Sequence, residues 1–226
     1  MNAPVAVLVP AAGSGVRLGP GQPKALRLLA GEPLLVHAVR GLRAAPSVGQ
    51  LVVAAPPADL DDIRSLLAPY AVVVVPGGAE RQDSVRSALA VLDAGVELVL
   101  VHDAARCLTP VEVVEAVVAA LRAGADAVVP VLPVSDTVKA VEGDRVTATL
   151  DRTALRAAQT PQGFRRDVLE RAHGSHPAGG RPATDDAGLV EACGVAVTTV
   201  EGAPDAFKVT RPLDLLLAEA VLRARG

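Results

Sequence analysis

The 226-residue chain is long enough for one α/β domain with an appendage. Half of its residues are hydrophobic, but it has two Phe, one Tyr and no Trp, so Val, Leu and Ala must form the core. The formal net charge is −3, from 22 basic and 25 acidic residues. Such a chain lacks the basic face and stacking rings that nucleic acids require, and we expect no nucleic-acid partner.

Targeting and membrane signals are also missing from the sequence. There is no Lys or Arg before Arg17, so the basic region of a signal peptide is absent. No stretch approaches the roughly 18 uninterrupted apolar residues of a membrane span. We therefore expect a cytoplasmic protein without a membrane partner. Cys107 and Cys193 fit no metal or disulfide spacing, and both are expected to be small buried hydrophobes.

Short Val-rich runs alternate with amphipathic segments along most of the chain. This order predicts an α/β fold with a doubly wound, mostly parallel sheet, because strands covered on both faces are nearly all apolar. Thr109 is expected to cap one helix, which Gly124 closes. We expect strands at 5–9, 51–54, 71–75, 97–101, 126–132 and 195–200, and helices at 33–44, 57–68, 80–93, 110–123 and from Pro212 onward.

Residues 133–163 break this rhythm. Alternating β-like stretches surround a turn at Gly143-Asp144, which predicts a hairpin that leaves the sheet as an arm. The Gly, Pro and His content of residues 173–182 is typical of a surface loop. We expect one domain over residues 1–226, with the arm at about 133–163.

A glycine-rich loop, "PAAGSGVRLGPGQPK", follows the first predicted strand. It is not a dinucleotide fingerprint, because Leu18 stands where the third glycine belongs and Pro23 disfavours an immediate helix. It is not a P-loop either, because Lys24 is followed by Ala25 rather than by Ser or Thr. The loop could be a surface segment with two solvated cations. Its place at a strand's carboxyl end instead favours a phosphate site flanked by Arg17 and Lys24.

Lysine is rare in this chain, which makes each lysine worth testing. Of the 22 basic residues, 19 are Arg and three are Lys, namely Lys24, Lys139 and Lys208. Three lysines can arise by chance, and Lys139 is expected on the hairpin, where it can be solvated. A compact ammonium nevertheless differs chemically from a guanidinium fork.

Polar residues follow two other predicted strands. Gly77 and Gly78 form a turn after the strand at 71–75. After this turn, Ser84 could contact a base edge, and Arg81 or Arg86 could meet phosphate. The same residues could also be an ordinary helix N-terminus with no ligand.

Asp103 directly follows the strand at 97–101, where a carboxylate can hold Mg²⁺ on substrate phosphates. An ion pair with Arg106 that braces the loop is an equally good explanation. His102 is more easily explained as structural than as a base. Because the carboxyl ends of parallel strands meet at one edge, the three loops together predict a site for a nucleoside triphosphate with Mg²⁺.

Seven motifs occur in a characteristic order: "PAAGSGVRLGPGQPK", "GGAERQDSV", "LVHDAAR", "SDTVKA", "QTPQGF", "TDDA" and "FKVTRPLDL". With them the chain closely resembles the 2-C-methyl-D-erythritol 4-phosphate cytidylyltransferase family of the non-mevalonate isoprenoid pathway, over nearly its whole length. The resemblance implies a Rossmann-like nucleotidyltransferase fold. It also implies transfer of CMP from CTP to methylerythritol 4-phosphate, with Mg²⁺ or another divalent cation, releasing pyrophosphate.

The resemblance also implies roles for individual residues. In this family the arm carries Thr137 and Arg152 into the neighbouring subunit's site, so a homodimer is implied. The implied catalytic residues are Arg17, Lys24, Arg152 and Lys208; the CTP-binding residues are Ala11, Ala12, Gly13, Gly15, Gly78 and Ser84; and the substrate-binding residues are Asp103, which also holds the metal, Arg106, Thr137, Arg152, Thr160 and Lys208.

Three other functions remain open from the sequence. A ribitol 5-phosphate cytidylyltransferase would share the fold and the CTP motifs and differ in the alcohol-phosphate pocket. An NAD-binding oxidoreductase is disfavoured by the incomplete glycine pattern and by the missing acid after the second strand. A non-catalytic nucleotide sensor would leave Lys24 and Lys208 without a purpose.

Overall fold

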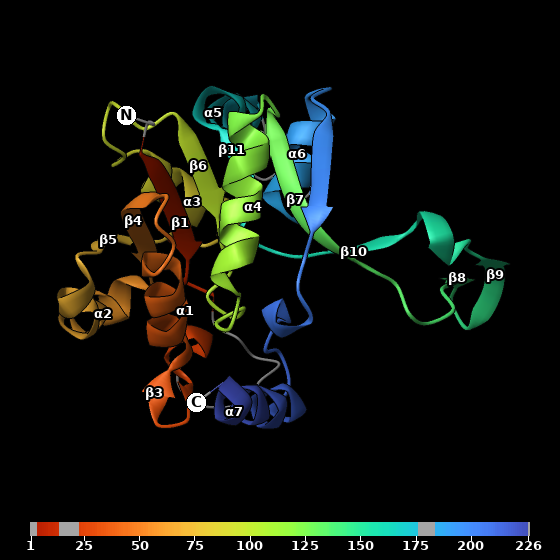
Figure 1. Ribbon diagram of the computed structural model, residues 1–226, viewed down its shortest axis with the longest axis horizontal. Coiled ribbons are helices and arrows are strands. Elements are labelled where there is room, and N and C mark those ends of the chain that lie inside the picture. Colours follow the sequence, from red (N-terminus) through yellow and green to blue (C-terminus); the bar gives the residue numbers. More distant parts are fainter. Residues whose placement is uncertain (1–3, 14–22, 176–183, 226) are drawn as a thin grey trace.

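The centre of the molecule is an eight-stranded sheet in which most neighbouring strands are parallel (Figure 1). The computed structural model describes residues 4–13, 23–175 and 184–225. The strand order is β10-β7-β11-β6-β1-β4-β5, and β12 pairs in parallel with β7. Strands β10 and β11 are antiparallel to their neighbours. The strands are β1 Val5–Pro10, β4 Val48–Ala55, β5 Val73–Pro76, β6 Leu98–Val101, β7 Ala127–Pro133, β10 Arg156–Ala158, β11 Gln162–Arg165 and β12 Val197–Glu201.

Helices cover both faces of this sheet, which confirms the predicted doubly wound fold. Val5, Val7 and Val9 of β1 pack with α1, α2 and α4 in one core cluster. Ala6 and Leu8, which point to the opposite face, pack with α3, α5 and α6 in a second cluster. The helices are α1 Leu34–Arg43, α2 Leu60–Leu67, α3 Arg81–Leu89, α4 Val111–Arg122, α5 Arg166–Ser175 and α6 Asp186–Ala192.

The C-terminal helix α7, Pro212–Arg225, lies beyond the carboxyl ends of the central strands (Figure 1). Its Ala218 joins a third cluster that includes the short paired strands β2, Leu28–Leu29, and β3, Glu32–Pro33. Cys107 is buried in this cluster, and burial raises the pKa of its thiol to about 12. Cys193 is exposed, so the prediction that both cysteines are buried is wrong for Cys193. None of the helices of the described residues has the length and apolar character that a bilayer crossing requires.

A hairpin projects from the body as an arm (Figure 1). It consists of β8, Lys139–Glu142, and β9, Arg145–Thr149, with Gly143 at φ +60 in the predicted turn. The chain returns through a 3₁₀ turn at Arg152–Ala154 and then enters the main sheet as β10 and β11. The expected arm of about 133–163 is therefore too long at its C-terminal end, because those two strands belong to the body.

Three local details differ from the sequence predictions or extend them. The expected surface loop at 173–182 begins too early, because residues 173–175 end α5; the remainder lies outside the described residues. Thr109 does not cap α4, because its hydroxyl donates to the carbonyl of Arg106. Gly124, at φ +108, does end that helix in the left-handed region.

Gly163 of β11 lies directly under α4, so a side chain there has no room. A Cβ at this position would lie 2.4 Å from Cγ1 of Val117 and 2.9 Å from Cδ2 of Leu100. We predict that Gly163→Ala lowers the free energy of unfolding by about 1–3 kcal/mol, as overpacking does. Urea denaturation measures this. Gly95→Ala is the matched control, because its Cβ would meet nothing within 4 Å. Equal stabilities for the two variants would contradict this reading of the β11–α4 contact.

Candidate active site

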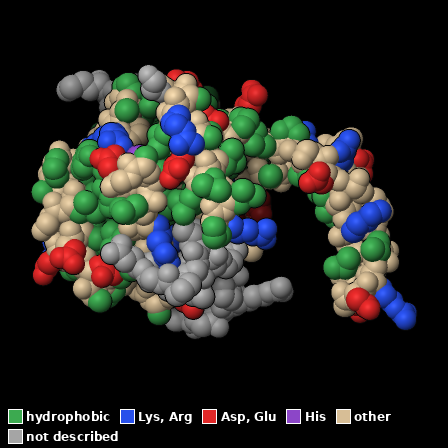
Figure 2. All heavy atoms as spheres, turned by 90° about the horizontal axis from the view of Figure 1, so that it is seen from below, with side chains coloured by type: hydrophobic (Ala, Val, Ile, Leu, Met, Phe, Trp, Pro, Cys, Tyr) green, Lys and Arg blue, Asp and Glu red, His purple; other side chains and the backbone are tan. Residues whose placement is uncertain are grey.

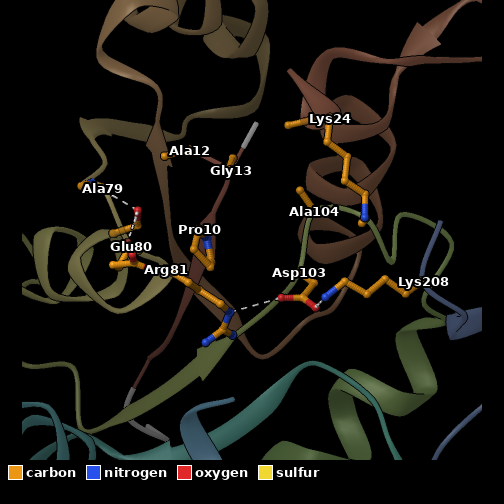
Figure 3. A pocket seen from close by; sticks show the side chains of 15 residues that line it. Pro10, Ala12, Gly13, Lys24, Ala79, Glu80, Arg81, Asp103, Ala104 and Lys208 are labelled. Carbon is orange, nitrogen blue, oxygen red and sulfur yellow. Dashed lines mark hydrogen bonds and ion pairs between the residues drawn. The ribbon is translucent and has the colours of Figure 1, made fainter. Parts of the chain in front are cut away.

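The loops that follow β1, β5 and β6 meet in one pocket of about 240 Å³ (Figure 3). This confirms the prediction that three polar strand ends form a single crevice. Two lysines complete it: Lys24, in a short 3₁₀ turn at the end of the loop after β1, and Lys208, which precedes α7. The lining residues are Pro10, Ala11, Ala12, Gly13, Lys24, Ala25, Gly78, Ala79, Glu80, Arg81, Ser84, Asp103, Ala104, Ala105 and Lys208.

Small residues bring the loops after β1 and β5 close together. A Cβ on Gly77 would lie 2.6 Å from the Cβ of Ala12 and 2.9 Å from Oγ of Ser84. Ser84 is buried; its hydroxyl accepts from the backbone N–H of Gly78 and donates to the carbonyl of Glu80. Asp83 and Glu80 also form a capping box that fixes the start of α3. This side of the pocket is therefore rigid and lined by backbone.

Asp103 is a carboxylate of the pocket lining, and a cation lies at each of its oxygens (Figure 3). Nζ of Lys208 is 2.6 Å from Oδ2, and Nε of Arg81 is 3.5 Å from Oδ1. Burial alone would raise the pKa of Asp103, but Arg81 and Lys208 together hold it well below its usual range. The carboxyl is therefore ionised at any working pH.

Arg106 does not form the ion pair with Asp103 that the sequence left open. Its guanidinium donates instead to the carbonyls of Ala206 and Ala158, at 2.8 and 3.1 Å. Arg106 thus ties the strand-end loop to the segment before Lys208 and to β10. It lies beside the pocket and does not line it.

Thr160 and His102 hold the backbone at Asp103 in place. The Thr160 hydroxyl accepts from the Asp103 backbone N–H, at 3.0 Å, and lies 3.2 Å from Nδ1 of His102. Nε2 of His102 faces the carbonyl of Arg106. Burial lowers the pKa of His102 to about 4, so the imidazole is neutral. His102 is structural, as the sequence indicated, and supplies no base.

The arm residues stay apart from the pocket within a single chain. Thr137 and Arg152 are exposed, and Arg152 donates to the carbonyl of Ser135 on the arm itself. Gly15 and Arg17 lie outside the described residues. The structure therefore brings together the predicted site residues Ala11, Ala12, Gly13, Lys24, Gly78, Ser84, Asp103 and Lys208, with Arg106 and Thr160 next to them.

Sequence reasoning underrated one pocket residue. Arg81 was only one of two arginines that could meet phosphate, and nothing in its spacing separated it from Arg86. In the structure Arg81 lines the pocket, while Arg86 contacts Asp83 and the carbonyl of His173. The burial of Asp186, which pairs with Arg81, has no sequence signal beyond its place in "TDDA".

Comparison with known proteins decides the family. A model of the family described as 2-C-methyl-D-erythritol 4-phosphate cytidylyltransferase matches residues 5–224. The chain belongs to this family. It is 59% identical over 219 residues to the Frankia casuarinae enzyme of that name, covering 96% of this chain and 81% of the relative. It is 56% identical over 224 residues to the one from Saccharopolyspora erythraea, covering 96% and 99%.

Solved structures agree with this assignment. The cytidylyltransferase of Thermus thermophilus superposes with a TM-score of 0.80 at 40% identity, covering 97% of this chain and 99% of that one. The 4-diphosphocytidyl-2C-methyl-D-erythritol synthase of Anaerococcus prevotii superposes with a TM-score of 0.86 at 27% identity, covering 97% and 96%.

Membership of the cytidylyltransferase family confirms the predicted fold class and enzyme class. The chain is a CTP-dependent nucleotidyltransferase that acts on 2-C-methyl-D-erythritol 4-phosphate in the non-mevalonate isoprenoid pathway. The oxidoreductase, the nucleotide sensor and the ribitol 5-phosphate enzyme that the sequence left open are therefore set aside.

The neutral, buried imidazole of His102 has a measurable consequence for stability. A free histidine titrates near pH 6.5, and burial lowers the pKa of His102 to about 4. As the pH falls between these values, the unfolded chain binds a proton that the folded chain does not, so the free energy of unfolding decreases. We predict that urea denaturation shows a smaller decrease over this range for His102→Asn. An imidazole NMR titration of His102 with a midpoint near 6.5 would contradict the assignment.

Proposed function

We propose that the pocket holds CTP and methylerythritol 4-phosphate side by side and that its charged side chains position and neutralise them. The observation that carries this proposal is the convergence of Lys24, Lys208 and Asp103, from three distant segments, in one pocket at the strand ends. Two anionic reactants repel each other, so a site that gathers cations around the reacting phosphates lowers the barrier.

The loop after β1 and the start of α3 are assigned to CTP. Backbone amides at Ala12 and Gly13, with Gly15, can approach phosphate oxygens because no large side chain intervenes. Ala11 lines the same side of the pocket, and its own N–H donates to the carbonyl of Ala54. Gly78 and Ser84 then contact the cytosine. The close approach of Gly77 to Ala12 supports this assignment, because it brings the loop after β1 next to the start of α3, so both segments can contact one nucleotide.

The opposite side of the pocket is assigned to methylerythritol 4-phosphate. Lys208 lies there, and Arg106 and Thr160 fix the surrounding backbone. Thr137 and Arg152 are assigned to the same substrate, from the arm of a second subunit.

The reaction needs positioning more than proton transfer. An oxygen of the methylerythritol phosphate attacks the α-phosphorus of CTP in line; the new O–P bond forms as the bond to pyrophosphate breaks. A phosphate monoester with its second pKa at about 6 is largely ionised near neutral pH, so no general base is required. Arg17 and Lys24 neutralise the charge that develops on the triphosphate, and Lys208 and Arg152 hold the nucleophile.

A divalent cation, Mg²⁺ for preference, is part of this proposal, with Asp103 as its protein ligand. Among the described residues no group of three or more His, Cys, Asp or Glu side chains is arranged to hold a metal. One ionised carboxylate suits Mg²⁺, which commonly binds one or two carboxylates together with substrate phosphates. When bound, the ion would neutralise phosphate charge; Asp103 must then share or exchange its contact with Lys208.

We also propose a homodimer formed through the arm. The arm exposes Val141 and Val146, at 62% and 60%, and extends away from the body (Figure 2). An isolated two-stranded hairpin is marginally stable, so apolar side chains on it favour a partner. Each subunit is proposed as one domain, supported by the continuous sheet, and as cytoplasmic, since polyanionic substrates do not cross membranes unaided.

The lone lysine of the glycine loop gives the sharpest test of the CTP assignment. We predict that Lys24→Ala lowers kcat by about a hundredfold or more, as loss of one transition-state donor does. Pyrophosphate release is measured with CTP, Mg²⁺ and methylerythritol 4-phosphate, with ribitol 5-phosphate in parallel. Lys139→Ala is the matched control, because this arm lysine bonds to Thr149 outside the pocket. Similar rates for the two folded variants would remove Lys24 from the mechanism.

The shared site can be tested with mixed dimers. Lys24→Ala and Arg152→Ala subunits are co-expressed with different tags, and the mixed species is isolated. If each arm reaches the partner's site, one site in each mixed dimer carries both substitutions, and the other site has Lys24 and Arg152 intact. We therefore predict about half of the wild-type activity in the isolated mixed dimer, and little in either parent. Activity no higher than the parents, in a confirmed mixed dimer, would count against arm exchange.

A further inference from the structure

Arg81 lies between two carboxylates, one in the pocket and one in the interior. Its Nη1 is 2.6 Å from Oδ2 of Asp186, and its Nε is 3.5 Å from Oδ1 of Asp103. Figure 3 shows the guanidinium reaching from α3 toward Asp103, opposite Lys208. The guanidinium fork is planar and rigid, so anchoring one of its nitrogens fixes the direction of the others.

Asp186 is a firm anchor because it is fully buried and held on both oxygens. Nε2 of His173 in α5 lies 2.9 Å from Oδ1, while Arg81 takes Oδ2. Burial would raise the pKa of Asp186, but the hydrogen bond from His173 and the charge of Arg81 lower it. The carboxyl is thus an ionised group inside the second core layer.

The first turn of α6, which carries Asp186, is itself tied to the sheet. Gln162 of β11 donates to Oδ2 of Asp185, at 2.6 Å, and accepts from the backbone N–H of Ala187, at 3.1 Å. The other oxygen of Asp185 accepts from the N–H of Gly188 and caps the helix. A buried strand, a helix cap and a histidine therefore determine where Asp186 lies.

Stability alone does not account for this arrangement. Removing charges from water costs more than their attraction commonly returns, and buried ion pairs are often replaced by apolar residues without loss. What the ion pair with Asp186 adds is a fixed orientation of the Arg81 guanidinium at the pocket wall. Each oxygen of Asp103 has its own cation, Arg81 at Oδ1 and Lys208 at Oδ2. A carboxylate that gave up Lys208 to a substrate phosphate would keep its contact with Arg81.

We propose that Arg81 is a positioning residue for the cytidylyl transfer: it orients the Asp103 carboxylate, and Asp186, backed by His173, holds Arg81 in place. This inference rests on the proposed place of Asp103 in the active site. It gives α5 and α6, on the far side of the sheet from α1, a direct connection to the reacting groups.

The test is a double-mutant cycle read in both catalysis and stability. Arg81→Gln and Asp186→Asn are each expected to lower kcat/KM for CTP by about 10–100-fold, as lost supporting contacts do. Because Asp186 acts through Arg81, the double variant is expected to be no slower than Arg81→Gln. Its Tm is nevertheless expected to exceed that of either single variant, since no unpaired charge is left in the interior. In the double variant, Tm would therefore recover while kcat/KM would stay low.

Glu115→Gln is the matched control for a carboxylate-to-amide change. Glu115 of α4 binds the backbone N–H and hydroxyl of Ser47, at 3.0 and 2.7 Å, outside the pocket. It is expected to lower Tm and leave kcat/KM unchanged. If Asp186→Asn does not fold, His173→Gln replaces it in the same cycle with Arg81→Gln, with a smaller single effect and the same non-additivity.

The outcomes separate this inference from the assignment of the site. Multiplicative losses of kcat/KM in the double variant, or activity that recovers together with Tm, would overturn the positioning role. Asp103→Asn is measured alongside. If Asp103→Asn is inactive and Arg81→Gln is normal, only the role of Arg81 fails. If Asp103→Asn retains full activity, the proposed site itself is wrong.

Discussion

The structure depends on an ionised carboxylate held at the point where the sheet ends. Asp103 lies two residues after the end of β6, and its backbone N–H donates to Thr160 from the segment between the antiparallel strands β10 and β11. Its side chain draws Arg81 and Lys208 together although they lie far apart in the chain. Without this negative charge, two cations at one pocket wall would repel each other. Under the proposed function, the same charge would also hold a cation bound to phosphate.

A second constraint is the close approach of backbone segments around that carboxylate. Gly77 almost touches Ala12, and Gly163 lies under Val117 and Leu100. Both glycines let elements approach closely where any side chain would push them apart, one at the side of the pocket that is assigned to CTP and one under α4. Gly163 belongs to the segment that also carries Thr160 and Gln162. Because Gly163 has no side chain, this segment, which supports Asp103 and Asp186, can pack closely under α4.

The sequence predicted the parts of the fold that depend on hydrophobic pattern. The Val-rich parallel strands and the amphipathic helices that flank them lie close to their expected positions, because burial on two faces leaves a continuous apolar run. Strands β10 and β11 and helices α5 and α6 were missed. The two strands and α6 are only three, four and seven residues long, and the pairing of β11 with β7 and β6 and the packing of α5 on α6 involve residues remote in sequence. Local propensity carries no such information.

The site residues also divide into those that the sequence reveals and those that only tertiary contacts reveal. Lys24 and Lys208 were distinguished by the rarity of lysine in an arginine-rich chain, and Asp103 by its place after a buried strand. Arg81 could not be separated from Arg86 by spacing, because both lie on α3 and only the tertiary position of Asp186 decides which one faces the pocket. Residues that touch a ligand leave chemical signs in a sequence. Residues that orient them are ordinary polar residues until the fold places them.

Under the proposed dimer, the arm couples folding to assembly. Strands β8 and β9 pair with each other and not with the main sheet, and their valines are exposed. A partner that covers these side chains stabilises the hairpin, and the hairpin in turn delivers Thr137 and Arg152 to a site that the body of one chain leaves without them. Burial of the arm against the partner would then both stabilise the dimer and complete the active site. An enzyme built this way has a subunit body that can bind nucleotide by itself and a transfer reaction that needs two subunits.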